Sequence, residues 1–265
     1  MNPVMSNPTS SNPTSSNLTS SNPTSTNPVL LNNVEHADLR VAIRPGADYG
    51  DSVNQLPIYP SEFEEAQRSF PIVFRREEGG IQAYALLGLD RDENLFLEDG
   101  RWTSDYVPAV QRRGPFSVGL DASRSDGASQ GDPLVYIDLA DARVGAVDGL
   151  PVFLEHGGNA PLLDHIASVL RVLHEGVTTA PAIYAEFEDA GLLQPVDIQI
   201  SLSEEDGYEL PDLLTIDQSA LADLSGESLE ALHRSGLLRA ATMAASSLGN
   251  IQYLIDRKNR KRLLA

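Results

Sequence analysis

The chain contains no cysteine, so disulfides, thiolate metal ligands and cysteine nucleophiles are excluded. Both reducing and oxidising compartments tolerate a protein without thiols, so this absence does not assign a compartment. No apolar run approaches the ~18 residues of a transmembrane helix, and the N-terminus lacks the charged-then-apolar pattern of a signal peptide. We therefore expect a cytoplasmic protein with no membrane span, unless it is exported without a signal peptide.

Basic residues are scarce: 19 Lys and Arg stand against 38 Asp and Glu, giving a formal net charge of −19. A surface of this sign repels phosphate backbones, so we expect no nucleic-acid partner. The expected binding partner is therefore another protein or a small anionic ligand. No phosphate loop, dinucleotide fingerprint or zinc-protease motif is present, so the sequence identifies neither a cofactor nor a catalytic residue.

The N-terminus is a low-complexity repeat. Residues 6–25 repeat the unit Ser-Asn-Pro-Thr-Ser, which has no apolar side chains to bury and fits neither helix nor strand periodicity. We expect residues 1–30 to be a disordered tail, acting as a docking or spacer arm or simply a neutral repeat expansion. Deletion of residues 1–29 should then leave the stability unchanged. Residues 31–265 are long enough for one core, and we expect a single domain.

The periodicity of this domain predicts an α+β fold. Its N-terminal half is mainly antiparallel β, and 90–94 reads as a solvated turn of a hairpin between 81–89 and 95–97. Its C-terminal half combines helices with one β-hairpin, formed by 196–202 and 208–216. Strands are expected at 39–43, 71–75, 81–89, 95–97, 116–120, 134–139 and 152–154, and helices at 61–68, 104–112, 162–175, 180–190, 218–224, 227–234 and 237–262.

The most informative stretch is residues 153–161, where an acid and an imidazole precede a glycine pair, a helix-capping asparagine and a proline. His156 beside Glu155 suits a general base, whereas Gly157, Gly158 and the helix N-terminus suit an anion. Residues 155–159, ending at Asn159, are therefore our candidate ligand or partner site. The alternative is a strand-to-helix turn that serves only structure.

The motifs for a metal site or a nucleophile give weaker support for a functional site than residues 153–161 do. His36 and Asp38 match two ligands of the iron facial triad, with His156 as a third, but they also suit a role in fixing the chain before the first strand. His165 and His174 point about 180° apart on one helix and cannot share a metal. The serine-hydrolase pattern Gly-Ala-Ser-Gln-Gly, residues 127–131, lies in a polar loop without the strand and helix that such a nucleophile needs.

The last nine residues carry five of the nineteen basic side chains. In an acidic chain, such a group either contacts a partner or interacts with the helix C-terminus and the protein's own acidic surface. Both alternatives stay open. The candidate docking residues are Arg257, Lys258, Arg260, Lys261 and Arg262.

Five segments resemble the bacterial SapC family, from about residue 31 to the end of the chain: 31–41 (LNNVEHADLRV), 69–75 (SFPIVFR), 93–97 (ENLFL), 153–161 (FLEHGGNAP) and 255–260 (IDRKNR). The resemblance implies a link to surface-layer (S-layer) production and leaves surface association open. It also implies gene neighbours for halogenase-like flavoenzymes, TonB-dependent receptors and cupin-like proteins, but no catalytic residues. We expect an accessory or binding protein more than an enzyme, with a non-haem iron modifying enzyme at His36, Asp38 and His156 as the alternative.

Overall fold

The computed structural model describes residues 27–120, 133–202 and 207–264. The repeat at 6–25, the loop carrying Ser129 and the turn at 203–206 fall outside these residues. Strands dominate the N-terminal half and helices the C-terminal half, which confirms the predicted α+β class.

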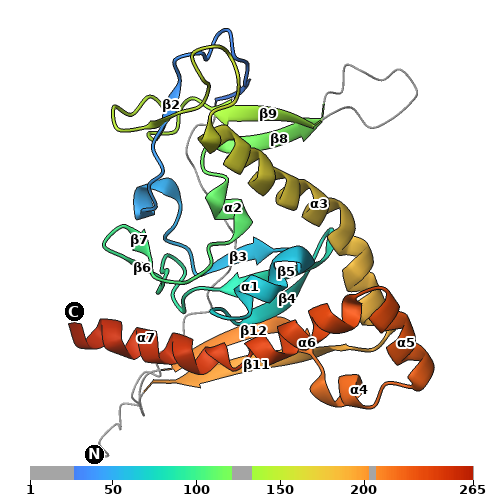
Figure 1. The fold of residues 1–265 in the computed structure, drawn as a ribbon. Coiled ribbons are helices and arrows are strands. Elements are labelled where there is room, and N and C mark those ends of the chain that lie inside the picture. The colour runs from blue at the N-terminus through green and yellow to red at the C-terminus, as the bar shows by residue number, and fades with distance from the viewer. Residues whose placement is uncertain (1–26, 121–132, 203–206, 265) are drawn as a thin grey trace, which may run out of the picture.

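The largest sheet has five antiparallel strands in the order β11-β12-β4-β5-β3 (Figure 1). The predicted C-terminal hairpin is confirmed as β11 and β12, with one register shift between Val196 and Ile198. The predicted hairpin between 81–89 and 95–97 is wrong, because β5 pairs with β4 and β3 instead. The strands are β3 Gln55–Ile58, β4 Ile72–Glu77, β5 Gly80–Leu86, β11 Leu193–Ser201 and β12 Gly207–Ile216.

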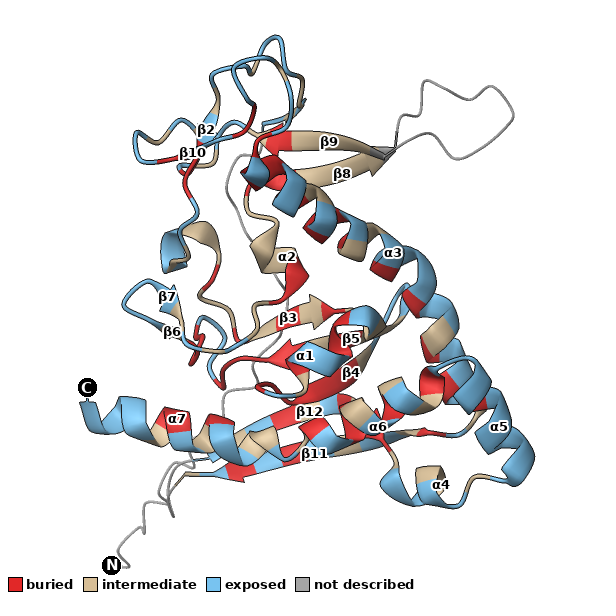
Figure 2. Cartoon of the chain, viewed as in Figure 1, coloured by how far each residue is buried: buried red, intermediate tan, exposed pale blue. Residues whose placement is uncertain are grey.

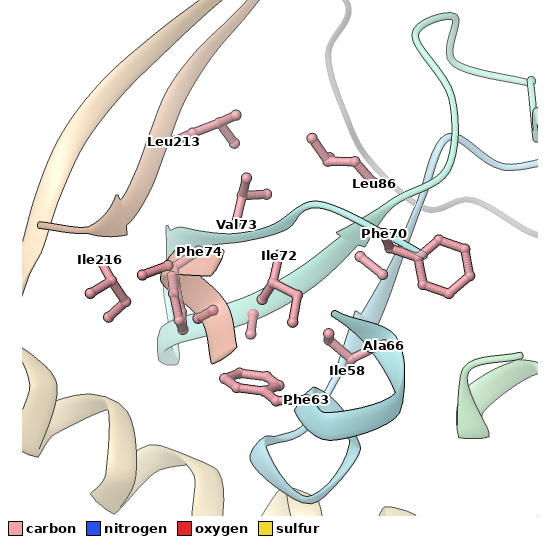
Figure 3. Close-up of a cluster of buried hydrophobic side chains, with 14 of the residues drawn as sticks. Ile58, Phe63, Ala66, Phe70, Ile72, Val73, Phe74, Leu86, Leu213 and Ile216 are labelled. Atoms are coloured by element: carbon pink, nitrogen blue, oxygen red, sulfur yellow. The ribbon is translucent and has the colours of Figure 1, made fainter. Parts of the chain in front are cut away.

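Short helices cover one face of this sheet, and both faces are packed. Figure 3 shows Phe74 and Ile72 on the side of Phe63, while Val73 points to the opposite side. Aromatic rings meet edge to face, as for Phe63 and Phe74 at 6.1 Å between centroids. The elements are η2 Pro60–Glu62, α1 Phe63–Ala66, α4 Gln218–Ala222, α5 Gly226–Arg234, α6 Leu237–Ser247 and α7 Asn250–Leu264. Where one helix was expected over 237–262, the chain breaks between α6 and α7 around Gly249.

A second layer lies at the other end of the molecule (Figure 1). Its three-stranded sheet has the order β1-β9-β8, so residues 28–30 pair with β9 and are not part of a tail. Residues 28–30, which the sequence placed in the tail, thus form a strand of this sheet. The elements of this layer are β1 Pro28–Leu30, β2 Arg40–Val41, β8 Phe116–Leu120, β9 Pro133–Asp138 and β10 Leu150–Pro151. Between the two layers lie η1 Ala47–Tyr49, β6 Leu97–Glu98, β7 Arg101–Trp102 and α2 Ala109–Arg112.

One long helix, α3 Pro161–Asp189, connects the two layers, where two helices were expected. Its first half packs in the cluster of buried side chains that contains Phe116, which we call the upper cluster. Its second half packs in the cluster that contains Phe74, which we call the lower cluster. Figure 2 shows buried residues along one side of α3 and exposed residues along the other. Gly176 does not end the helix: a Cβ there would lie 2.3 Å from Cγ of Tyr59, so the glycine allows a close approach. Of the helices that the structure describes, none has the length and apolar character needed to cross a bilayer.

Candidate functional site

Residues 155–159 form an exposed turn directly before α3. The Leu154 N–H donates to the Gly158 carbonyl at 2.7 Å, and the Gly157 N–H donates to the Leu154 carbonyl at 2.8 Å. Gly157 has a φ of 84°, which favours glycine. Glu155 and His156 are exposed, so His156 is not an enclosed structural residue.

The cap of α3 differs from the prediction. Ala160 occupies the N-cap position, and the Asn159 side chain donates to Asp164 at 3.2 Å instead of capping the helix. Pro161 stands in the first turn as expected. The role of residues 155–159 in binding a ligand or partner stays a prediction.

The segment of His36 lies beside this turn. The Asn33 side-chain amide donates to the Gly157 carbonyl at 2.9 Å, and His36 Nδ1 accepts from the Asn32 N–H at 3.2 Å. Asp38 is exposed. The His36 ring thus contacts its own turn, as in the structural alternative. Among residues 27–120, 133–202 and 207–264, no three His, Cys, Asp or Glu side chains form a group that could hold a metal ion.

Two of the C-terminal basic residues are buried against the protein itself. Arg257 donates from Nη1 to the Leu95 carbonyl at 3.0 Å and to Thr103 at 2.9 Å. Its guanidinium carbon lies 4.5 Å from the Phe96 ring centroid and 4.7 Å from that of Tyr253. These contacts hold α7 against residues 95–103.

Lys258 contacts the turn that was expected to be solvated. Its Nζ lies 2.9 Å from both carboxylate oxygens of Glu93, and it also binds Asp90. Lys261 Nζ reaches Glu93 at 3.0 Å. Glu93 and Asn94 are buried, whereas residues 90–92 of the same turn are exposed. Lys258 and Lys261 therefore interact with the protein's own acidic groups, as the alternative to partner docking proposed, while Arg260 is exposed.

A pocket of about 520 Å³ opens between α2, the first turns of α3 and the segment after β2. This volume suits a small organic ligand. We call it the Arg113 pocket. It is lined by Ala42, Ile43, Arg44, Pro45, Asp51, Trp102, Val107, Gln111, Arg112, Arg113, Gly114, Pro115, Phe116, Arg143, Leu150, Pro161, Leu162, His165 and Ile166.

Most of the wall is apolar and firmly packed. Phe116, Leu162 and Ile166 are buried members of the upper cluster. Asp51 is a buried carboxylate that accepts from Trp102 Nε1 at 2.7 Å and from the Gly46 N–H at 2.8 Å. Burial raises the pKa of Asp51 despite these hydrogen bonds. Trp102 thus helps to form the wall besides packing against the lower cluster.

Two arginines of the wall pair with carboxylates. Arg143 donates from Nε and Nη2 to the two oxygens of Asp141, at 2.9 and 2.6 Å. Burial acts to raise the pKa of Asp141, but the hydrogen bonds from Arg143 outweigh it and lower that pKa. Arg44 pairs with Asp148 at the surface. These two positive charges are therefore balanced.

A third arginine, Arg112, packs against an aromatic ring. Its guanidinium carbon lies 5.1 Å from the Tyr106 ring centroid, and Nη2 donates to the Tyr106 hydroxyl at 3.2 Å. The buried carboxylate of Glu62 is close enough to interact with it electrostatically. Arg112 Nε is buried without a hydrogen-bond partner. Arg112 is thus partly balanced by an acid.

Arg113 is different. Its Nη1 donates to the Phe116 carbonyl at 2.8 Å, and no carboxylate in the part of the chain that the structure describes pairs with it. Burial, and secondly repulsion from the positive charge of Arg143, lower the pKa of Arg113. Among the described residues, Arg113 is therefore a partly buried positive charge that pairs with no carboxylate, although the buried carboxylate of Asp51 lines the same pocket.

Sequence reasoning missed this pocket. A signal was present, since Arg112 and Arg113 are adjacent basic residues before a Gly-Pro turn in a strongly acidic chain. The predicted loop at 155–159 does not line the pocket, although Pro161 and Leu162, which follow it, do. His165, which we weighed above only as a metal ligand, is exposed and lines the pocket.

The family model described as SapC matches residues 31–254, which covers most of the chain. No curated protein matches. No solved structure matches either.

Proposed function

The chain belongs to the SapC family, and from that premise we propose that it is an accessory protein that binds a small organic anion in the Arg113 pocket. The family resemblance supports a role in surface-layer production or outer-membrane uptake. Binding, rather than chemistry on the ligand, is the activity that we assign to the pocket.

The observation that carries this proposal is that no carboxylate among the described residues pairs with Arg113. A partly buried cation without an acidic partner has lost hydration, and an anion that enters the pocket offsets this cost. A guanidinium also offers a planar pair of N–H donors that matches a carboxylate. Arg143 stands beside it but is already bound by Asp141, so Arg113 is the group that has donors to offer.

The experiment compares benzoate with benzamide, which has a similar ring but no charge, by titration of the full chain followed by NMR. We expect Arg113→Gln to weaken benzoate at least tenfold, because a hydrogen bond to a charged group contributes about 1.5–3 kcal/mol. Benzamide should bind equally to both proteins. The matched control is Arg171→Gln, which removes the same charge from an exposed position on α3.

Equal benzoate affinity in wild type and Arg113→Gln would contradict the proposal. His156→Ala belongs in the same titration, since residues 155–159 remain our second candidate for a ligand or partner surface. Their exposure and the exposed Leu154 beside them support a contact with another protein. A loss of benzoate affinity in His156→Ala would instead extend the ligand site to this turn.

A further inference from the structure

The Arg113 pocket combines one arginine that no carboxylate among the described residues pairs with and a wall that is mainly apolar. Asp141 pairs with Arg143, Asp148 pairs with Arg44 and Glu62 lies near Arg112, while the buried carboxylate of Asp51 also lines the pocket and interacts with Arg143. One arginine without a carboxylate partner, with Asp51 in the same wall, favours a monoanion over a ligand of higher negative charge. A dianion would bring an excess negative charge next to the buried carboxylate of Asp51.

The exposed part of the lining includes apolar side chains beside the polar Arg44 and His165. Ile43 is 59% exposed and Leu150 is 50% exposed, and both belong to the lining. The deeper wall is formed by Leu162 and Ile166, which are buried. A ligand that consists only of an anionic group would leave this surface in contact with water. A ligand with an apolar body covers it from the interior to the opening.

We infer that the ligand is a carboxylic acid with an extended apolar chain, held by Arg113 at its carboxylate and by the apolar wall along its body. This inference rests on the proposed function and adds the class of ligand. The carboxylate supplies the monoanion and the planar acceptor pair that a guanidinium recognises. The chain supplies the apolar surface that Phe116, Ile166 and the opening require.

The test is a calorimetric titration of the full chain with butanoate, hexanoate, octanoate and decanoate. Each methylene that enters the apolar wall should lower the Kd about fourfold, the factor expected for burying one such group. The methyl ester of octanoate, which keeps the chain but loses the charge, should bind at least tenfold more weakly than octanoate. A Kd that changes less than about 1.5-fold per methylene would overturn the inference.

Two variants locate the chain and the carboxylate separately. Ile43→Ser, at the exposed opening, should weaken decanoate about threefold or more and leave butanoate unchanged. Val147→Ser, at a position 99% exposed and outside the pocket lining, should change neither acid. Arg113→Gln should weaken all four acids by the same factor, since each carries one carboxylate.

The two proposals fail in different ways. A flat dependence on chain length, with a large effect of Arg113→Gln, leaves anion binding intact and overturns the apolar-chain inference. A steep dependence on chain length without any effect of Arg113→Gln overturns the proposed function, and with it the carboxylate as the recognised group.

Discussion

Replacing Lys258 by methionine should destabilise the protein by about 3 kcal/mol. The side chains of Lys258 and Glu93 are only 8% and 6% exposed, and their charged atoms lie 2.9 Å apart. Removing one partner of a buried ion pair costs about 3–5 kcal/mol, because the other charge stays buried. Lys261 still contacts Glu93 in the variant, so the lower end of this range applies.

Urea unfolding is the assay, followed by the fluorescence of Trp102, the single tryptophan. The matched control is Arg234→Met, which breaks an ion pair with Glu230 on α5 whose side chains are 75% and 60% exposed. An exposed i,i+4 pair contributes about 0.3–0.5 kcal/mol, so the control should hardly change the midpoint. The double variant Lys258→Met/Glu93→Leu removes both buried charges and should recover part of the loss.

The reasoning is refuted if the free energy of unfolding of Lys258→Met lies within about 0.5 kcal/mol of the wild-type value, which is the result expected for the exposed control. That result would mean that water screens the pair and that α7 is not fastened by it. It would also return Lys258 to the partner-docking role, in which the residue contributes to binding and not to stability.

Two further predictions concern packing. Gly176→Ala should destabilise the protein by about 1–3 kcal/mol through the clash with Tyr59, although alanine normally favours a helix over glycine by about 1 kcal/mol. Thermal unfolding measures this loss, and Gly226→Ala, which has open space around its Cβ position, is the control. A chain lacking residues 1–29 should melt at a lower temperature than one lacking 1–26, because β1 pairs with β9; equal melting temperatures would restore the sequence-based expectation.

The sequence predicted well those elements whose periodicity depends only on one buried face. The alternating apolar residues of β11 and β12 predicted their hairpin, and the spacing of Leu162, Ile166 and Val169 predicted the buried side of α3. Such patterns are local, because each residue faces the core or the solvent whatever the neighbouring element is.

The positions at which these helices and strands begin and end were less predictable. Gly176 carries the signal of a helix end, yet α3 continues through it and through Pro181. A glycine can end a helix or allow another residue to approach closely, and only the position of Tyr59 shows that Gly176 does the second. Residues 90–94 likewise read as a solvated turn, but Glu93 and Asn94 are buried in the structure, and Lys258 neutralises Glu93.

The sequence by itself determined the family, the α+β class and the negative net charge, because these follow from composition and from patterns along the chain. The Arg113 pocket was decided by the tertiary structure alone. Its wall joins residues 42–51, 102–116, 143–150 and 161–166, which are far apart in the sequence. Asp141 stands two residues before Arg143, so their ion pair is local in the sequence. What only the fold decides is that Arg113 lies in the pocket wall with no carboxylate among the described residues paired to it, which leaves it to hold an anion.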